Sequence, residues 1–333
     1  MKIGLDVIPM SKLDEIILIG KRAEAYDFYC VLISDHVKNR ALWVCLSALA
    51  LNTKKIKIGS GITNPYSNHP ALIAQNLATL DEIAKNRVIC GIGAGDEEAL
   101  KSIGIKRERP LTYVRESFGL IRAYLKGLRE YEGKIFKLKN FKSNFTTIGN
   151  IPLFIGAQGK LMLKLAGEMG DGVLINSSNV NYCSEAIETV NLALKERRSL
   201  EFGFEYGTIS PYSVANSYEE AKRIIAPIVG TVVAGCNDYV LQKHGIRIED
   251  KERVLKAIES RDLELIRKSV KDDMIENFSV TGKPEDCLEK MEELKKIGIS
   301  LFIGSLPSTK FIHDAMKLTK EKVLSYFQNK GES

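Results

Sequence analysis

Short apolar stretches alternate along the chain with longer segments in which apolar residues recur every three or four positions. The first pattern predicts buried β-strands, and the second predicts amphipathic helices. Helical patterns follow the early strands, for instance at residues 13–26, 43–52 and 111–126. Eight strands are expected, at residues 2–7, 30–34, 56–58, 88–92, 153–155, 173–175, 204–214 and 301–303.

Repeated strand and helix units, over somewhat more than ~250 residues, are typical of an α/β TIM (β/α)8 barrel with insertions. A doubly wound open sheet is the alternative. The barrel is favoured because strand after strand ends in Gly, Asp, Asn or Ser, which form ligand-binding loops at the carboxyl ends of barrel strands. We expect one domain, residues 1–333, with a mainly helical insertion at about 217–298, because no Pro/Gly/Ser linker frames that segment.

Two glycine-rich segments, residues 59–65 and 93–96, each follow a strand within one strand–helix–strand unit. A right-handed crossover brings both segments to the same edge of the sheet. Tight turns alone would explain one such segment, but two in register indicate a ligand site. Neither segment fits the dinucleotide pattern GxGxxG, and a P-loop is absent from the sequence.

Composition excludes few function classes. The 48 Lys and Arg residues exceed the 42 Asp and Glu residues by six, and they are spread over mixed-sign helices, so no nucleic-acid partner is expected. No apolar run approaches the ~18 residues of a membrane helix, and the first residues are typical of a strand. We therefore expect no membrane partner and a cytoplasmic location. The six cysteines are expected to be buried core residues, and the scattered histidines predict no metal site.

Polar residues that end the first four strands should converge on one mouth, and they are Asp6, Asp35, His36, Thr63, Asn64 and Asp96. A carboxyl group withdrawn from water into such a mouth has a raised pKa and can donate a proton near neutral pH. Helix capping or ion pairing is the alternative for each acid, and hydrogen-bonded packing is the alternative for the histidine. After the fifth and sixth strands, backbone N–H groups and small side chains suit a phosphate, and they belong to Gly156, Ala157, Gln158, Gly159, Asn176 and Ser177.

Several motifs, in order along nearly the whole chain, resemble those of one family. They are Ser34-Asp35-His36 with Asn39-Arg40, GSGITNPY with Pro70-Ala71, ATLDEIAKNR followed by GIGAGD, IGAQG, DGVLINSSN and DDMIENFSVTGKPEDC. No single motif is decisive, but their shared order and spacing are specific. The chain is similar to the coenzyme F420-dependent methylenetetrahydromethanopterin reductases, which belong to the bacterial-luciferase-like superfamily of barrels.

The resemblance implies that the barrel holds the deazaflavin ring of F420 in its mouth. A bulge with a non-prolyl cis peptide bond between Gly61 and Ile62 would support the back of the ring. Asp35 and His36 would lie beside the ring. The segments after the fifth and sixth strands would take the phosphate and the acidic tail of the cofactor.

The resemblance also implies that the reaction needs an acidic side chain to supply a proton. Reduction of the methylene bridge of the pterin needs a hydride from the cofactor and a proton on the departing nitrogen, and it needs no metal. The family uses a glutamate on the first strand, and Asp6 matches this position with a side chain one methylene shorter. Asp96 matches the family motif and would bind the pterin, and Gln158 could hydrogen-bond the same ligand.

Departures from the family at Ser60, Asn68 and His69 leave the substrate open. The chain could reduce another pterin, or it could oxidise a secondary alcohol with His36 taking the hydroxyl proton. FMN is a less favoured cofactor than F420. A catalytically silent F420-binding subunit is the non-enzymatic alternative, although such a subunit would not need four polar strand ends. Related barrels associate through their early helices, so the resemblance implies a homodimer or homotetramer.

Overall fold

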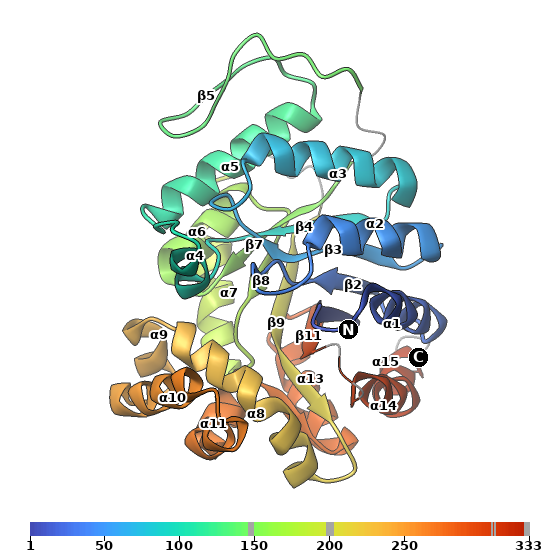
Figure 1. Ribbon diagram of the computed structural model, residues 1–333, viewed down its shortest axis with the longest axis vertical. Helices are drawn as coiled ribbons and strands as arrows, with labels where there is room; N and C mark the ends of the chain where they lie inside the picture. Colours follow the sequence, from blue (N-terminus) through green and yellow to red (C-terminus); the bar gives the residue numbers. More distant parts are fainter. Residues whose placement is uncertain (146–149, 198–202, 308, 310, 330–333) are drawn as a thin grey trace.

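Eight parallel strands form a closed barrel in the computed structural model, which describes residues 1–145, 150–197, 203–307, 309 and 311–329 (Figure 1). Strand β11 pairs with β1, and β8 pairs with β9, so the barrel has no open edge. The predicted TIM barrel is confirmed, and the open doubly wound sheet is wrong. The strands are β1 (Lys2–Ile8), β2 (Cys30–Ile33), β3 (Lys57–Thr63), β4 (Val88–Ile92), β7 (Leu153–Ala157), β8 (Gly172–Ile175), β9 (Glu205–Val214) and β11 (Leu301–Pro307).

Helices connect the strands and surround the barrel. Proline is the first residue of three of them, where its fixed φ suits the first turn and its missing N–H costs no hydrogen bond. A small hairpin of β5 (Tyr131–Glu132) and β6 (Lys137–Leu138) projects beyond α5 (Figure 1). The surrounding helices are α1 (Leu13–Ala25), α2 (Leu42–Asn52), α3 (Pro70–Ala84), α4 (Glu97–Ser102), α5 (Pro110–Leu125), α6 (Lys160–Met169), α7 (Val180–Leu194), α13 (Pro284–Lys296), α14 (Phe311–Leu318), the π-helix η1 (Thr319–Leu324) and α15 (Ser325–Asn329).

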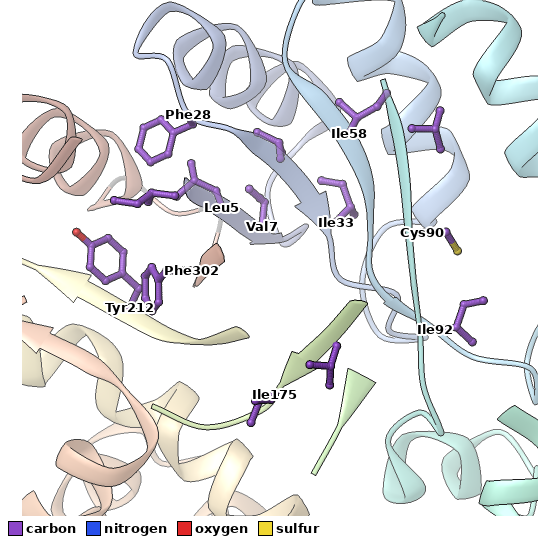
Figure 2. Close-up of a cluster of buried hydrophobic side chains, with 14 of the residues drawn as sticks. Leu5, Val7, Phe28, Ile33, Ile58, Cys90, Ile92, Ile175, Tyr212 and Phe302 are labelled. Atoms are coloured by element: carbon purple, nitrogen blue, oxygen red, sulfur yellow. The ribbon is translucent and has the colours of Figure 1, made fainter. Parts of the chain in front are cut away.

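Side chains alternate between the two faces of each strand, and the two faces form separate hydrophobic clusters. The outward face packs against the helices, and Figure 2 shows some of its side chains, among them Leu5, Val7, Ile33, Ile58 and Ile92. The inward face fills the barrel with residues that include Leu32, Phe154, Leu174 and Ile303. Asp6 lies between two outward-facing residues, so the same period of two directs its side chain into the barrel.

The helical segment before β11 divides into two parts by its packing. The first part is α8 (Tyr218–Gly235), α9 (Asp238–Lys243), α10 (Ile248–Ser260), α11 (Leu263–Ser269) and α12 (Asp272–Phe278), which enclose a hydrophobic cluster of their own. Figure 1 shows α8 to α11 gathered at one end of the molecule, in yellow and orange. We call α8 to α12 the helical insertion. Helix α13 instead contributes to the main core. That the whole chain is one domain stays a prediction.

A short strand within this segment, β10 (Val280–Gly282), was not predicted. It pairs in parallel with the last three residues of β9. Three residues are too few to show a period of two, so the sequence pattern carries no signal for it. The cysteine prediction is confirmed, because all six thiols are free and buried. Within the described part of the chain, no helix combines the length and the apolar content that a membrane span needs.

One carboxylate anchors the turn that leads into β3. Glu24 of α1 accepts hydrogen bonds from the backbone N–H groups of Lys54 at 2.8 Å and Ile56 at 2.9 Å, and from that of Lys55. Burial opposes the ionised form of Glu24, but these hydrogen bonds and the nearby Arg87 together hold its pKa below the usual value. The carboxylate therefore fixes the start of β3 against α1.

Glu24→Ala should lower the free energy of unfolding by about 2 kcal/mol, because three backbone donors lose a charged acceptor. Glu82→Ala removes an exposed carboxylate from α3 and is the matched control, with an expected change below about 0.5 kcal/mol. Urea unfolding at pH 7, followed by circular dichroism, measures both values. Equal stability of the two variants would contradict the anchoring role of Glu24.

Candidate active site

Asp6 lies inside the barrel, near the carboxyl end of β1, where the interior changes from apolar to polar. Its side chain is only 3% exposed. Its carboxylate accepts hydrogen bonds from Ser34 Oγ at 2.9 and 3.0 Å and from Ser305 Oγ at 2.8 Å. Ser305 lies opposite Asp6 in the pairing of β11 with β1. Three neighbouring segments of the barrel thus bring one acid and two hydroxyl groups together.

Burial raises the pKa of Asp6 to about 7, although the hydrogen bonds from Ser305 and Ser34 act in the opposite direction. Removing a carboxylate from water disfavours the charged form more than two neutral donors can compensate. At neutral pH such a group is protonated in about half of the molecules. Asp6 is therefore a carboxyl group that can donate a proton under ordinary conditions.

Strand β3 bulges directly beside Asp6. The register between β3 and β4 shifts between Ser60 and Thr63, and the peptide bond between Gly61 and Ile62 is cis. The bulge and the cis bond implied by the family resemblance are confirmed. A β-carbon at Gly61 would lie 2.8 Å from Asp6 Oδ1, so the carboxyl group packs against bare backbone.

The side chain of Ile62 extends from the bulge towards the ends of the next two strands. A β-carbon built at Gly93, after β4, or at Gly156, in β7, would lie 2.2 or 2.3 Å from Ile62 Cδ1. Real β-carbons do not approach other atoms so closely, so a side chain at either position would force the end of the Ile62 side chain to move. These glycines of the fourth and fifth strand ends therefore make room for Ile62 behind the bulge.

Asp35 and Thr63 form a second polar pair in the mouth. Thr63 Oγ1 donates to Asp35 Oδ2 at 2.6 Å, and Asn68 Nδ2 donates to the same oxygen at 3.3 Å. Burial raises the pKa of Asp35, while the hydrogen bond from Thr63 and the nearby His36 oppose the shift. The ends of β2 and β3 are thus joined through side chains that were predicted as neighbours.

His36 and Asp96 lie within electrostatic reach of each other at the rim. Burial lowers the pKa of His36, and the charge of Asp96 opposes this shift. His36 Nδ1 accepts a hydrogen bond from the N–H of Lys38 at 3.3 Å, which leaves the proton of the neutral ring on Nε2. Asp96 is exposed and caps α4, with Oδ1 accepting from the N–H of Ala99 at 2.6 Å. Its capping role is therefore observed, and its role in substrate binding stays a prediction.

Asn64 shapes the loop that follows β3. Its Oδ1 accepts hydrogen bonds from the N–H groups of Tyr66 and Ser67, both at 3.0 Å, and its side chain is 5% exposed. This is the way in which an asparagine closes a turn on its own backbone. Contact between Asn64 and a cofactor stays a prediction.

The loops after β7 and β8 are joined to each other and to the helical insertion. The N–H of Asn176 donates to the carbonyl of Ala157 at 3.2 Å, and Gly159 precedes the first turn of α6. Gln158 Nε2 donates to Cys236 Sγ at 3.1 Å. Ser177 Oγ lies 2.8 Å from His244 Nε2. The two loops predicted to bind phosphate are therefore in contact with each other. Cys236 and His244 of the helical insertion contact one loop each.

Four residues of this site were not predicted. Ser34 and Ser305 could have been found, since each lies two positions after an apolar residue of the inward face. Cys236 and His244 could not, because 78 and 67 residues separate them from their partners Gln158 and Ser177. No periodic pattern relates positions so far apart.

Known proteins similar to this chain identify its family. The model of the luciferase-like monooxygenase family matches residues 2–301. The chain is 37% identical to a 5,10-methylenetetrahydromethanopterin reductase of Archaeoglobus fulgidus, over 92% of this chain and 94% of the relative. It is 33% identical to a 5,10-methylenetetrahydromethanopterin reductase of Methanolobus tindarius, over 97% of this chain and 100% of the relative.

Solved structures agree with these relatives. The coenzyme F420 dependent tetrahydromethanopterin reductase from Methanopyrus kandleri matches with a TM-score of 0.89 and 33% identity, over 98% of this chain and 99% of that one. An F420-dependent secondary alcohol dehydrogenase matches with a TM-score of 0.78 but only 21% identity, over 97% and 98% of the two chains, and so shares the fold alone. This chain therefore belongs to the luciferase-like family and, within it, to the 5,10-methylenetetrahydromethanopterin reductases.

Proposed function

We infer that this chain is an oxidoreductase that transfers a hydride between coenzyme F420 and methylenetetrahydromethanopterin and so interconverts the methylene and methyl forms of the pterin. The reductases that it resembles over nearly its full length support this function. The structural observation that carries it is Asp6, a buried acid with a pKa of about 7 beside the bulge of β3. Opening a carbon–nitrogen bond of the pterin needs an acid of this kind.

The residues of the mouth fit a flat, anionic cofactor. Gly61 and Ile62 are half-exposed and offer backbone in place of bulky side chains, and Ile62 is supported from behind by the glycines of β4 and β7. We propose F420 in preference to FMN, because the similar reductase of known structure depends on F420. The chemistry that F420 supplies when bound is hydride transfer. The absorption spectrum of the bound cofactor distinguishes F420 from FMN.

The part of this chain in the reaction is proton transfer. We propose that the neutral carboxyl group of Asp6 donates its proton to the departing nitrogen of the pterin. Ser34 Oγ lies within hydrogen-bond distance of both carboxylate oxygens and Ser305 donates to Oδ2, so the anion that remains is stabilised where it forms. In the reverse direction the same anion accepts the proton.

The other predicted site residues keep their proposed roles. Asp35, His36, Thr63 and Asn64 would border the ring, and Asp96 and Gln158 would bind the pterin. The phosphate of the cofactor would lie at the loops after β7 and β8, against Gly156, Ala157, Gly159, Asn176 and Ser177. Oxidation of a secondary alcohol is the weaker alternative, because only the fold is shared with that enzyme. The reaction uses small, freely diffusing coenzymes, so we also propose a cytoplasmic location.

We propose that two copies of this chain associate through α2. This helix contains no charged residue, and its exposed face carries Val44 at 58% and Leu51 at 72% exposure. Ser47 and Ala48 lie between them on the same face and are small enough for a second helix to approach closely. A self-complementary apolar patch of this kind suits a twofold interface.

Asp6→Asn should lower kcat at least about a hundredfold, because the amide cannot donate a proton to the pterin. The assay mixes the purified protein anaerobically with reduced F420 and methylenetetrahydromethanopterin and follows the return of oxidised F420 absorbance. Asp14→Asn removes an exposed acid from α1 and should leave kcat unchanged. Bound F420 without turnover in the wild-type protein would refute the substrate, and full activity of Asp6→Asn would refute the proton donor.

The stability of the wild-type protein should fall between pH 5 and pH 8 by roughly 2–3 kcal/mol more than that of Asp6→Asn. The folded pKa of Asp6 is about 7, above the ordinary value of 3.8, so the folded state binds this proton more tightly. The stabilisation is therefore complete below about pH 4 and is lost as the pH rises through 7. Urea unfolding at both pH values measures it, and identical pH dependence in the two proteins would show that Asp6 is not a shifted acid.

Leu51→Lys should shift the protein from dimer towards monomer, because it places a charge in the proposed apolar contact of α2. Leu192→Lys, at a leucine of α7 that is 65% exposed, is the matched control and should leave the assembly unchanged. Analytical ultracentrifugation at micromolar protein concentration reports the masses. A monomeric wild-type protein, or a dimer that tolerates Leu51→Lys, would exclude this interface.

A further inference from the structure

The turn that joins α8 to α9, together with the residue that ends α9, reaches three successive loops of the mouth. A β-carbon at Gly235, the last residue of α8, would lie 3.9 Å from Asp96 Oδ2, beyond β4. Cys236 accepts the hydrogen bond from Gln158, beyond β7. His244 contacts Ser177, beyond β8. The helical insertion therefore forms one wall of the mouth.

His244 is held in one orientation and one protonation state. It is 4% exposed and lies between two aromatic rings, 4.6 Å from that of Tyr182 and 4.4 Å from that of Phe278, between ring centroids. Its Nδ1 lies 2.7 Å from the carbonyl oxygen of Val240, which can only accept, so Nδ1 carries the proton. Burial lowers the pKa of His244, although the hydrogen bond to Val240 opposes the shift. Nε2 is consequently an acceptor for the hydroxyl of Ser177.

The side chain of Ser177 is fully engaged in holding its own loop. Its hydroxyl donates to His244 and accepts the N–H of Asn179 at 3.1 Å, and the side chain is 1% exposed. Thr208 of β9 also donates a hydrogen bond to the carbonyl of Ser177. The backbone N–H groups of Ser177 and Ser178 donate to no acceptor within the described residues. Ser177 and Ser178 are 1% and 0% exposed, so this loop is tightly packed, and its serine hydroxyl points to the insertion.

We propose that His244 is a positioning residue for the anionic end of the cofactor and that it acts through Ser177. This proposal rests on the proposed function, since it assigns the loop after β8 to the phosphate of F420. A loop that is already fixed before binding loses less entropy when an anion binds beside it. His244 supplies that fixation from a part of the chain outside the barrel, and it touches neither ring nor substrate.

Two substitutions at this one position separate positioning from mere packing. The longer side chain of His244→Gln places an amide near the position of Nε2 and can keep the contact with Ser177. The shorter side chain of His244→Asn places its amide near the position of Nδ1 and can keep only the contact with Val240. We expect His244→Asn to raise the dissociation constant for F420 about tenfold, and His244→Gln to remain within about threefold of the wild type.

The measurement is an equilibrium titration of each protein with F420, followed by the fluorescence of the deazaflavin. The same titration with the deazaflavin that lacks phosphate and tail should give equal affinities for all three proteins, since His244 acts only on the anionic end. At saturating F420, kcat of His244→Asn should equal that of the wild type. An increase in KM for F420 without a loss of kcat distinguishes positioning from catalysis.

A control within the insertion addresses stability. Asp250 of α10 is 2% exposed and is held by Arg247, Arg253 and Lys271. Asp250→Asn should lower the melting temperature and leave the affinity for F420 unchanged.

The outcomes separate the two proposals. Failure of the wild-type protein to bind F420 would overturn the proposed cofactor. Tight binding by the wild type, together with equal binding by His244→Asn, would overturn the role of His244 and leave the proposed function intact. Equal weakening for the deazaflavin without phosphate would also overturn it.

Discussion

The desolvation of a single carboxyl group, that of Asp6, is the constraint on which the proposed chemistry of this barrel depends. The interior below Asp6 is filled by apolar side chains such as Leu32, Leu174 and Ile303, so water does not reach the group from that side. Two serine hydroxyls are the donors that the neighbouring strands provide. Neutral hydroxyls stabilise a carboxylate less than water or a cation would, and the pKa rises to about 7. The position of Asp6 in the fold, more than its residue type, raises its pKa and so supports the proposed role as proton donor.

Close packing against glycine residues surrounds the bulge in β3. Gly61 leaves space for Asp6, and Gly93 and Gly156 leave space for the end of the Ile62 side chain. A side chain at Gly61 would force Asp6 to move, and one at Gly93 or Gly156 would force the end of Ile62 to move. Glu24 fixes the residues that lead into the strand, so its entry is anchored as firmly as its exit. Strands β1, β3, β4 and β7 are therefore coupled through close contacts, and the hydroxyl of Ser60 adds hydrogen bonds to the backbone of Gly91 between β3 and β4.

The helical insertion contacts the loops that follow β7 and β8 at the mouth of the barrel. The helical insertion encloses a hydrophobic cluster of its own beside the barrel. Cys236 and His244 each meet one predicted loop of the mouth. In this arrangement the barrel supplies Asp6 and the exposed backbone of Gly61 and Ile62. The insertion contacts the loops that we propose for the anionic end of the cofactor. The hydroxyl of Ser177 faces His244 in this arrangement, and contact between Ser177 and a phosphate stays a prediction.

The sequence by itself determined the alternation of strands and helices, the barrel and most of the polar residues at its mouth, because these follow from short periods and from residues at strand ends. Family motifs added the cis bond at Gly61 and Ile62, which no periodicity could supply. Only the tertiary structure decided which polar groups meet. The raised pKa of Asp6 depends on burial, the capping of α4 by Asp96 depends on local geometry, and the partnership of Ser177 with His244 joins residues far apart in the chain. Strand β10 was not predicted, because its three residues are too few to show the period of two that marks a strand. Contacts of this kind depend on how distant segments pack, and packing leaves no regular spacing in the sequence.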